Sequence, residues 1–233
     1  FYLAEKGYKP TIFEKNERAG GMLVYGIPSF KLEKDVVQAE IDIIKEMGVE
    51  IKTGVEVGKD ITLDELRAQG YKAFYIAIGC QGGRLPGIPN DTAKGCASAV
   101  DLLKEVNANE KYDIKGDVVV IGGGNVSMDA VRTAKRLGAK KVSIVYRRRT
   151  ADMTALPAEI EGAVAEGIEV LTLKAPSRIE TDENGHVSGI YVTPQMISKI
   201  KDGRASVCPT GEEDFLIPCQ TPVSYTHLTL PTI

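Results

Sequence analysis

Hydrophobic positions along the chain alternate between short continuous runs and stretches with helical spacing. The run Val118–Ile121 is apolar and β-branched, as expected for a strand that is buried on both faces. Between residues 126 and 137 the apolar positions recur at helical spacing, and Gly138 follows as a helix-ending residue. A second apolar run, Val142–Tyr146, comes next. Residues 117–149 therefore predict a strand–helix–strand unit.

The same reasoning predicts the elements on either side of this unit. Helices are expected at residues 1–7, 34–47, 98–106 and 159–166, with a short helix after the capping box Thr62–Glu65. Strands are expected at 10–13, 168–173 and 187–193, with a hairpin turn at 182–185 and a second hairpin that pairs 205–208 with 215–218. We expect this meander to cover one edge of its domain, and we assign no chemistry to it.

The turn between the first strand and the helix is rich in glycine. Gly122 allows a tight turn, Gly124 lets the backbone approach a pyrophosphate, and Ser127 is small enough for close packing of helix and strand. Serine departs mildly from the usual Gly or Ala. The helix start at Asn125 and Val126 offers unpaired N–H groups and a partial positive charge to phosphates. This pattern predicts a dinucleotide site, although a glycine triplet can also be a simple turn.

The end of the second strand indicates which dinucleotide is bound. A carboxylate roughly 20 residues past the turn would accept hydrogen bonds from the ribose 2′-OH of NAD. This chain has Arg147, Arg148 and Arg149 at that position. A guanidinium matches a phosphate dianion with two parallel hydrogen bonds, so the pattern favours NADPH over NADH. The alternative is that the arginines are solvated or bind another anion.

Composition narrows the class of protein. The net charge of −3 gives no reason to expect nucleic acid or an anionic membrane as a partner, and the chain has no run of about 18 apolar residues. The four cysteines are scattered too widely for a zinc or dithiol site, and no metal site is predicted: Cys80, Cys96, Cys208 and Cys219. We interpret them as reduced, mostly buried thiols of a cytoplasmic protein.

The beginning of the chain looks like the second half of another dinucleotide unit. A helix that ends at Gly7 is followed by a strand over 10–13 and then by Glu14. A carboxylate at the end of such a strand is the ribose-binding position of a dinucleotide fold. The alternative is that Glu14 is a solvated loop residue.

Four segments together carry a family resemblance. Glu14–Gly21, Tyr25–Leu32, Gly122–Asn125 and Tyr146–Arg148 resemble the corresponding motifs of the small subunit of NADPH-dependent glutamate synthase. They are similar also to the FAD/NADPH module of dihydropyrimidine dehydrogenase and of ferredoxin-linked oxidoreductases. The resemblance extends from Phe1 to about Cys219.

The resemblance implies an FAD site in the first part of the chain. Glu14 would hold the FAD ribose, and Lys31 stands where the family usually has arginine. Val57 would give backbone contacts to the adenine, and Tyr75–Gly79 matches a strand whose last glycine passes close to FAD. Val57 and Ala77 can also be interpreted simply as core strand positions. The implied FAD-binding residues are Glu14, Lys15, Gly20, Gly21, Met22, Lys31, Val57 and Gly79.

The resemblance also implies a fold and an activity. The fold would be α/β, with two Rossmann-like domains and the NADPH domain inserted into an FAD domain truncated at both ends. The expected parts are a partial FAD domain at 1–92, an NADPH domain at 93–222 and a non-native or disordered tail at 223–233. Hydride would pass from NADPH to FAD without a catalytic side chain. Electrons would then pass to iron–sulfur centres on missing regions or on a partner subunit, such as the glutamate synthase large subunit or a ferredoxin-type protein.

Other functions compete with this one. A disulfide reductase would need a close cysteine pair beside the flavin, and the region 18–32 has none. A flavin monooxygenase would need a substrate domain that we do not find. The chain could also be a non-catalytic NADP(H)-binding module or an inactive fragment. Even as part of a flavin enzyme, the isolated polypeptide is expected to bind FAD weakly or not at all and to be inactive by itself. The final electron acceptor stays open.

Overall fold

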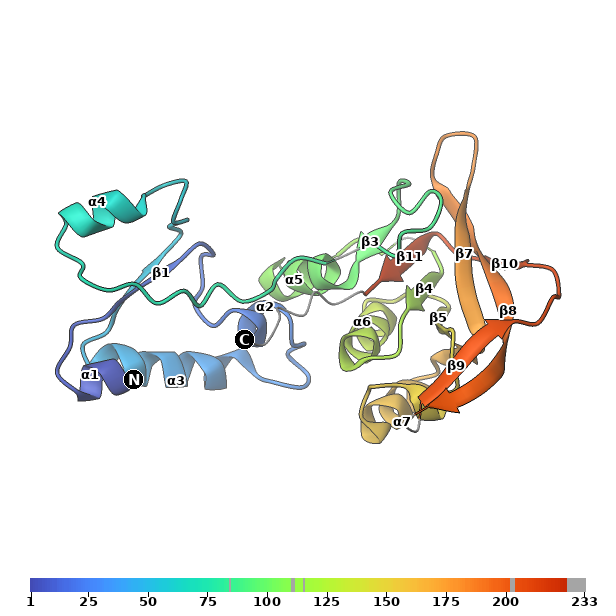
Figure 1. Cartoon of the computed structure of the whole chain (residues 1–233), viewed down its shortest axis with the longest axis horizontal. Coiled ribbons are helices and arrows are strands. Elements are labelled where there is room, and N and C mark those ends of the chain that lie inside the picture. Colours follow the sequence, from blue (N-terminus) through green and yellow to red (C-terminus); the bar gives the residue numbers. More distant parts are fainter. Residues whose placement is uncertain (84, 110–111, 115, 202–203, 226–233) are drawn as a thin grey trace. The chain divides into compact units, whose positions relative to one another are not determined.

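A computed structural model describes residues 1–83, 85–109, 112–114, 116–201 and 204–225 (Figure 1). The chain divides into two compact units, Phe1–Cys80 and Gln81–Ile233. Each unit contains helices and a parallel sheet, which agrees with the α/β class predicted from the sequence. That the FAD domain ends at residue 92 and the NADPH domain begins at residue 93 stays a prediction.

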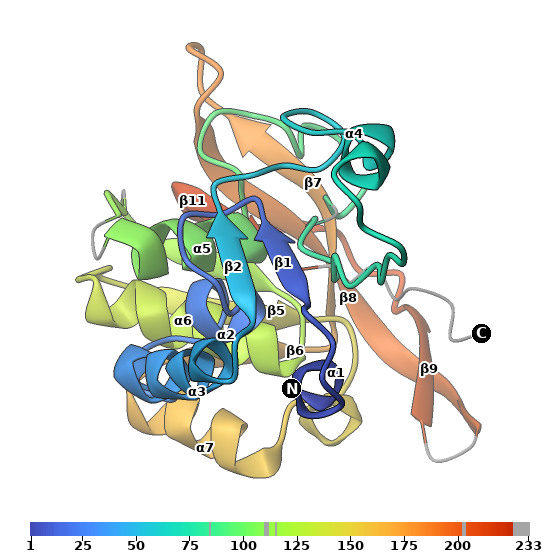
Figure 2. The same cartoon turned by 90° about the vertical axis from the view of Figure 1, so that its left-hand side faces the viewer.

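The first unit is small and is built around a strand–helix–strand arrangement. Strands β1 and β2 are parallel and lie side by side, with Thr11 opposite Glu50 (Figure 2). The buried side chains of α2 and α3 form its core together with Ile51. The elements of this unit are α1 (Tyr2–Glu5), β1 (Thr11–Glu14), α2 (Met22–Tyr25), α3 (Lys34–Glu46), β2 (Glu50–Thr53) and α4 (Leu63–Ala68). The predicted capping box at the start of α4 is confirmed, because Thr62 and Glu65 bond reciprocally.

The second unit is organised around a five-stranded parallel sheet with the strand order β3-β11-β4-β5-β6. The predicted unit at 117–149 is confirmed as β4, α6 and β5. Helices α5, α6 and α7 cover one face of the sheet (Figure 1). The elements up to β6 are β3 (Ala97–Ser98), α5 (Ala99–Asn109), β4 (Val118–Ile121), α6 (Asn125–Arg136), β5 (Val142–Tyr146), the 3₁₀ turn η1 (Thr150–Asp152), α7 (Pro157–Ala165) and β6 (Glu169–Thr172).

An antiparallel sheet covers the other face. It consists of β7 (Lys174–Thr181), β8 (Val187–Lys201), β9 (Arg204–Pro209) and β10 (Phe215–Pro218). Alternate residues of a strand point to opposite faces, so Val118 and Val120 pack against the helices whereas Val119 packs against this second sheet. Two covered faces explain why the run Val118–Ile121 is apolar throughout. The meander was expected to cover one edge of its domain, and in the structure it covers one face of the parallel sheet.

The predicted second hairpin is also wrong. Residues 205–208 and 215–218 do not pair with each other, because both pair with β8. The sequence predicted that this strand ends at Thr193, but it continues to Lys201. A strand of this length offers separate stretches to two partners. Strand β10 pairs with residues 189–192 of β8, and β9 pairs with residues 195–201.

The expected strand at Tyr75–Gly79 is not formed. Tyr75 is 90% exposed and Ile78 is 80% exposed, and neither lies in a strand. A strand that is apolar on both faces needs sheet neighbours and covering layers, and this segment has no strand partner in the part of the chain that the structure describes. Val57 likewise is no core strand residue, because it forms only an isolated bridge to Ile61 and is largely exposed.

Strand β11 extends beyond the predicted domain boundary at residue 222. Residues Thr221–Ser224 form β11, which lies between β3 and β4 in the parallel sheet. Val223 and Ser224 are buried there. The predicted start of a non-native or disordered tail at residue 223 thus falls within β11, and the non-native origin of the tail stays a prediction. The remainder of the predicted tail, residues 226–233, lies outside the described residues.

The structure tests the two expectations about cysteine burial and membrane-spanning helices. All four cysteines are free, but only Cys219 is fully buried, between the two sheets. Cys80, Cys96 and Cys208 are half-buried, so the expectation of mostly buried thiols is wrong. Across the described ranges, no helix has both the length and the apolar character that a bilayer span requires.

Candidate functional site

The glycine turn after β4 is constrained by the helix that follows it. Gly122 has φ +140°, and a Cβ added to it would lie 2.6 Å from Oγ of Ser127. Ser127 is itself fully buried in the first turns of α6. The predicted close packing of a small residue at 127 against the turn is therefore present, and any side chain at 122 would displace it.

Gly123 is a packing position that sequence reasoning missed. A Cβ at Gly123 would lie 2.8 Å from the Tyr146 ring and 3.0 Å from Cγ of Met153. A Cβ at Gly124 would meet Thr154 Oγ1 at 3.4 Å, which is close to an ordinary contact. The middle glycine thus lets the end of β5 and the loop after it approach the turn.

The N-terminus of α6 presents free hydrogen-bond donors. The N–H groups of Gly124, Asn125 and Val126 have no acceptor within the described part of the chain. No acidic residue lies in the first turn to neutralise the positive end of the helix dipole. The turn therefore has the chemistry of an anion site.

The loop from Thr150 to Leu156 is fastened to this turn. Thr154 and Ala155 both donate their N–H groups to the Gly123 carbonyl, at 2.9 and 3.0 Å. The Asn125 side chain accepts from the N–H of Leu156 at 2.9 Å. Asn125 therefore contributes its backbone to the helix start and its side chain to holding the loop.

The three predicted arginines differ in their surroundings. Arg147 is exposed and has no hydrogen bond or ion pair to any described residue. Arg148 is half-buried and donates through Nε to the Ala205 carbonyl at 2.8 Å. Arg149 donates to both carboxylate oxygens of Asp152, from Nε at 2.8 Å and from Nη2 at 3.0 Å. Among the described residues, Arg147 and Arg148 thus have no partner on either terminal nitrogen, whereas one terminal nitrogen of Arg149 is bonded to Asp152.

Asp152 was missed by sequence reasoning. Its side chain is 1% exposed, and the hydrogen bonds from Arg149 and from the Ala205 N–H hold the pKa of its carboxyl well below the usual range. The Tyr146 hydroxyl donates to its backbone carbonyl at 2.8 Å. An acidic residue three positions after an arginine was a local signal that could have found the pair.

The predicted FAD residues of the first unit are only partly gathered. Glu14 ends β1, and its Oε1 accepts from the backbone and side-chain nitrogens of Asn16 at 2.8 and 2.7 Å. The Val55 N–H bonds to the Glu14 carbonyl, which brings the segment of Val57 near the end of β1. Gly79 lies on the exposed irregular segment, and no contact of it with these residues is seen.

Three of the remaining predicted residues, Gly20, Gly21 and Met22, lie at the start of α2. Gly20 has φ +118°, and a Cβ there would lie 2.5 Å from Val24 Cγ2, so only glycine fits. Gly21 is the N-cap of α2, Met22 begins the helix, Lys15 is exposed and Lys31 is half-buried. An apolar groove of about 310 Å³ runs beside this turn and α3, and its lining includes Gly20, Leu23, Leu32, Val36, Ile41 and Ile44.

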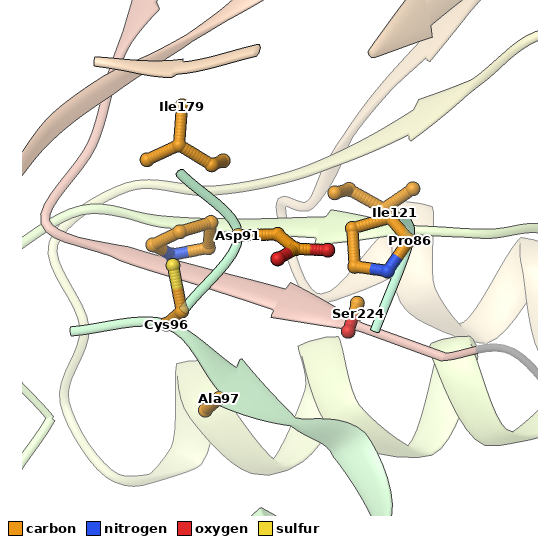
Figure 3. A pocket seen from close by; sticks show the side chains of 8 residues that line it. Pro86, Asp91, Cys96, Ala97, Ile121, Ile179 and Ser224 are labelled. Carbon is orange, nitrogen blue, oxygen red and sulfur yellow. The ribbon is translucent and has the colours of Figure 1, made fainter. Parts of the chain in front are cut away.

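A cavity in the second unit lies where β4 and β11 end. Figure 3 shows the Asp91 carboxylate, Cys96 and Ile121 around it. The Asp91 carboxylate accepts from the Gly87 N–H at 2.8 Å. The cavity measures about 10 Å³, which is the space of about one water molecule, so it cannot hold a nucleotide.

Comparisons with known proteins agree with the motifs. The family model described as pyridine nucleotide-disulphide oxidoreductase matches residues 1–203. The NADP(+)-dependent formate dehydrogenase subunit beta of Moorella thermoacetica is 37% identical over 223 residues, which cover 94% of this chain and 31% of the relative. The glutamate synthase NADPH small chain of Escherichia coli (strain K12) is 36% identical over 199 residues, which cover 81% of this chain and 42% of the relative.

A solved structure has a similar fold. Mycobacterium tuberculosis FprA in complex with NADPH matches with a TM-score of 0.77 at 20% identity, over 96% of this chain and 65% of that one. This match supports the α/β fold with parallel sheets, and the relative from Escherichia coli confirms the resemblance to glutamate synthase small chains. The chain spans 31% and 42% of the length of the two curated relatives.

Proposed function

Because the chain belongs to the pyridine nucleotide-disulphide oxidoreductase family, we propose that it is the NADPH-binding, flavin-reducing part of a larger oxidoreductase. Bound NADPH would supply a hydride and bound FAD would accept it. The names of two relatives, an NADP(+)-dependent formate dehydrogenase subunit and an NADPH glutamate synthase small chain, support the choice of coenzyme.

One observation carries the proposal: free N–H groups at the start of α6 and free guanidinium donors at the end of β5. In the register of the sheet, Ile121 of β4 stands opposite Val145 of β5, so the glycine turn and the arginines follow neighbouring strand ends. The backbone of Gly124, Asn125 and Val126 would bind the pyrophosphate, with Gly122 and Ser127 giving the turn its shape.

The 2′-phosphate would be bound by the arginines that keep unused donors. Arg147 is free to turn toward a ligand, and Arg148 has its two terminal nitrogens available after its Nε bond to Ala205. A phosphate dianion accepts such paired donors well, whereas the ribose hydroxyl of NADH offers no matching charge. Selectivity for NADPH follows from this difference.

The first unit would hold FAD. One carboxylate oxygen of Glu14 is already bonded to Asn16, and the other oxygen would accept from a ribose hydroxyl. Lys15, Gly20, Gly21, Met22 and Lys31 would line the flavin side, and Val57 and Gly79 would give backbone contacts. These assignments rest on the family resemblance and on the geometry of Glu14 and Gly20.

The place of the chain in an assembly is part of the same proposal. The relatives from Moorella thermoacetica and Escherichia coli are named as a subunit beta and a small chain. Electrons would leave the flavin for iron–sulfur centres on a partner subunit or on another domain, in the cytoplasm. Disulfide reduction is not proposed, because the four cysteines are free and none lies in the flavin segment 18–32.

Dye reduction tests the proposed activity. The chain by itself is expected to bind FAD weakly or not at all and to be inactive. The test therefore uses the chain extended at both ends with the corresponding segments of a relative, supplied with excess FAD; this version is expected to reduce an artificial electron-accepting dye with NADPH and far more slowly with NADH. The variant Arg148→Gln is expected to lose most of the difference between the two coenzymes. Tight NADPH binding without dye reduction at saturating FAD would favour a non-catalytic binding module. No binding of NADPH would contradict the proposal as a whole.

A further inference from the structure

Asp152 links two segments that are far apart in the sequence. On one side, its carboxylate accepts from the backbone N–H of Arg149 at 3.2 Å and from the Arg149 guanidinium at 2.8 and 3.0 Å. On the other side, it accepts from the backbone N–H of Ala205 in β9 at 3.0 Å. With a side chain that is 1% exposed, Asp152 is fully committed to these groups.

Ala205 uses both of its backbone groups in the same region. Its N–H donates to Asp152, and its carbonyl accepts from Nε of Arg148 at 2.8 Å. Along an antiparallel strand, residues alternate between those that bond the neighbouring strand and those that do not. A residue of the second kind points its N–H and its carbonyl away from that neighbouring strand. The buried residue Ala205 therefore presents its carbonyl to Arg148 and its N–H to Asp152 rather than to β8.

We propose that Asp152 is a positioning residue for recognition of the coenzyme 2′-phosphate: it anchors β9, whose Ala205 carbonyl orients Arg148, and it holds Arg149 away from the phosphate. This inference rests on the proposed function. It adds strand β9 to a coenzyme site that would otherwise consist of the glycine turn and the arginines alone.

The charges of the site support this division of roles. The hydrogen bonds between Arg149 and Asp152 raise the pKa of the arginine and lower that of the aspartate, so both stay charged and compensate each other. The uncompensated positive charges at the end of β5 are then those of Arg147 and Arg148. A guanidinium is a rigid planar fork, so fixing Nε of Arg148 also fixes the direction of its terminal nitrogens.

Two probes that differ only in the 2′-phosphate measure this effect on the full chain. Adenosine 2′,5′-bisphosphate and AMP are titrated separately, and the ratio of their dissociation constants is the readout. Asp152→Ala removes the acceptor for Ala205, so the ratio should fall by about tenfold to a hundredfold, mostly through weaker binding of the bisphosphate. The matched control Glu161→Ala removes an exposed carboxylate from α7 and should keep the ratio within about twofold.

A second pair of variants separates anchoring from charge pairing. Ala205→Pro removes the N–H that Asp152 accepts and also fixes φ of this residue, and should lower the ratio as Asp152→Ala does, even if the latter does not fold. Arg149→Gln leaves the bond between Ala205 and Asp152 intact and should lower the ratio far less than Arg148→Gln does. Melting temperatures are recorded for each variant, because a purely structural role would lower stability and leave the ratio unchanged.

The outcomes distinguish the inference from the proposed function. If the wild-type chain binds the bisphosphate no more tightly than AMP, the proposed 2′-phosphate site itself is wrong. If the wild type discriminates and the folded Asp152→Ala and Ala205→Pro variants discriminate equally well, only the positioning role is overturned. Equal losses for Arg149→Gln and Arg148→Gln would also overturn it, since Arg149 would then be a phosphate ligand.

Discussion

Replacing Gly122 by alanine disturbs the turn between β4 and α6 in two separable ways. The backbone at φ +140° is unfavourable for an L-residue, and the new Cβ would lie 2.6 Å from Oγ of Ser127. The Cβ of Ser127 is 3.8 Å from the same point, an ordinary contact. The steric conflict therefore comes from one oxygen atom, which Ser127→Ala removes.

The expected free energies follow from these contacts. A backbone forced into the left-handed region costs about 1–2 kcal/mol, and overpacking a tight site costs about 1–3 kcal/mol more. Gly122→Ala should thus lower the free energy of unfolding by about 2–5 kcal/mol. Ser127→Ala should be neutral or stabilising, because Oγ is buried without a hydrogen-bond partner in the described part of the chain.

A double-mutant cycle measured by urea unfolding tests this reasoning. The double variant should recover the overpacking part, which gives a coupling of about 1–3 kcal/mol between positions 122 and 127. The control is Gly138→Ala, where φ is +97° but no atom lies within 4 Å of the added Cβ. Gly138→Ala should lower the free energy of unfolding only by the cost of the left-handed backbone conformation, and it should show no coupling to Ser127→Ala. Additivity of Gly122→Ala and Ser127→Ala within about 0.5 kcal/mol would refute the proposed contact.

Further predictions concern stability elsewhere in the second unit. Hydrogen bonds from Arg136 and Arg132 lower the pKa of Glu166 below its ordinary value of 4.5. The ionised Glu166 side chain therefore stabilises the fold fully above pH 4.5, and this stabilisation is lost as the pH falls through the lowered pKa. The stability difference between wild type and Glu166→Gln, from urea unfolding at several pH values, should therefore shrink below pH 4.5; a constant difference would contradict this. Ile190 is fully buried between the two sheets, so Ile190→Ala should cost about 2–5 kcal/mol. Ile200→Ala, at a 59% exposed position of the same strand, should stay within about 0.5 kcal/mol in the same assay, and equal losses would refute the assigned layers.

The sequence predicted the elements that are determined by residues close together along the chain. The apolar run of β4, the helical spacing of α6 and the glycine after it lie within one short stretch, and so do the capping residues of α4. Strand pairing is not local, and for this reason the partner of β9 was predicted wrongly. The segment Tyr75–Gly79 has the composition of a strand, but a strand also needs neighbours, and in the described structure it has none.

The same distinction between local and distant causes applies to the residues of the candidate site. The turn at Gly122, the close packing of Ser127 and the place of the arginines after β5 could be predicted, because they follow from spacing along the chain; their role in coenzyme binding stays a prediction. The distinct surroundings of Arg148 and Arg149 could not, since one depends on Ala205, which lies 57 residues further along the chain. The pairing of Arg149 with Asp152 was within reach, because the two residues are three positions apart and a carboxylate beside a guanidinium is a familiar ion pair.

Calorimetric titration of the chain with NADPH and with NADH tests the central claim most directly. The account predicts that NADPH binds at least about tenfold more tightly, and that Arg148→Gln removes most of this difference while the affinity for NADH changes little. Equal affinity of the wild-type chain for the two coenzymes would contradict it.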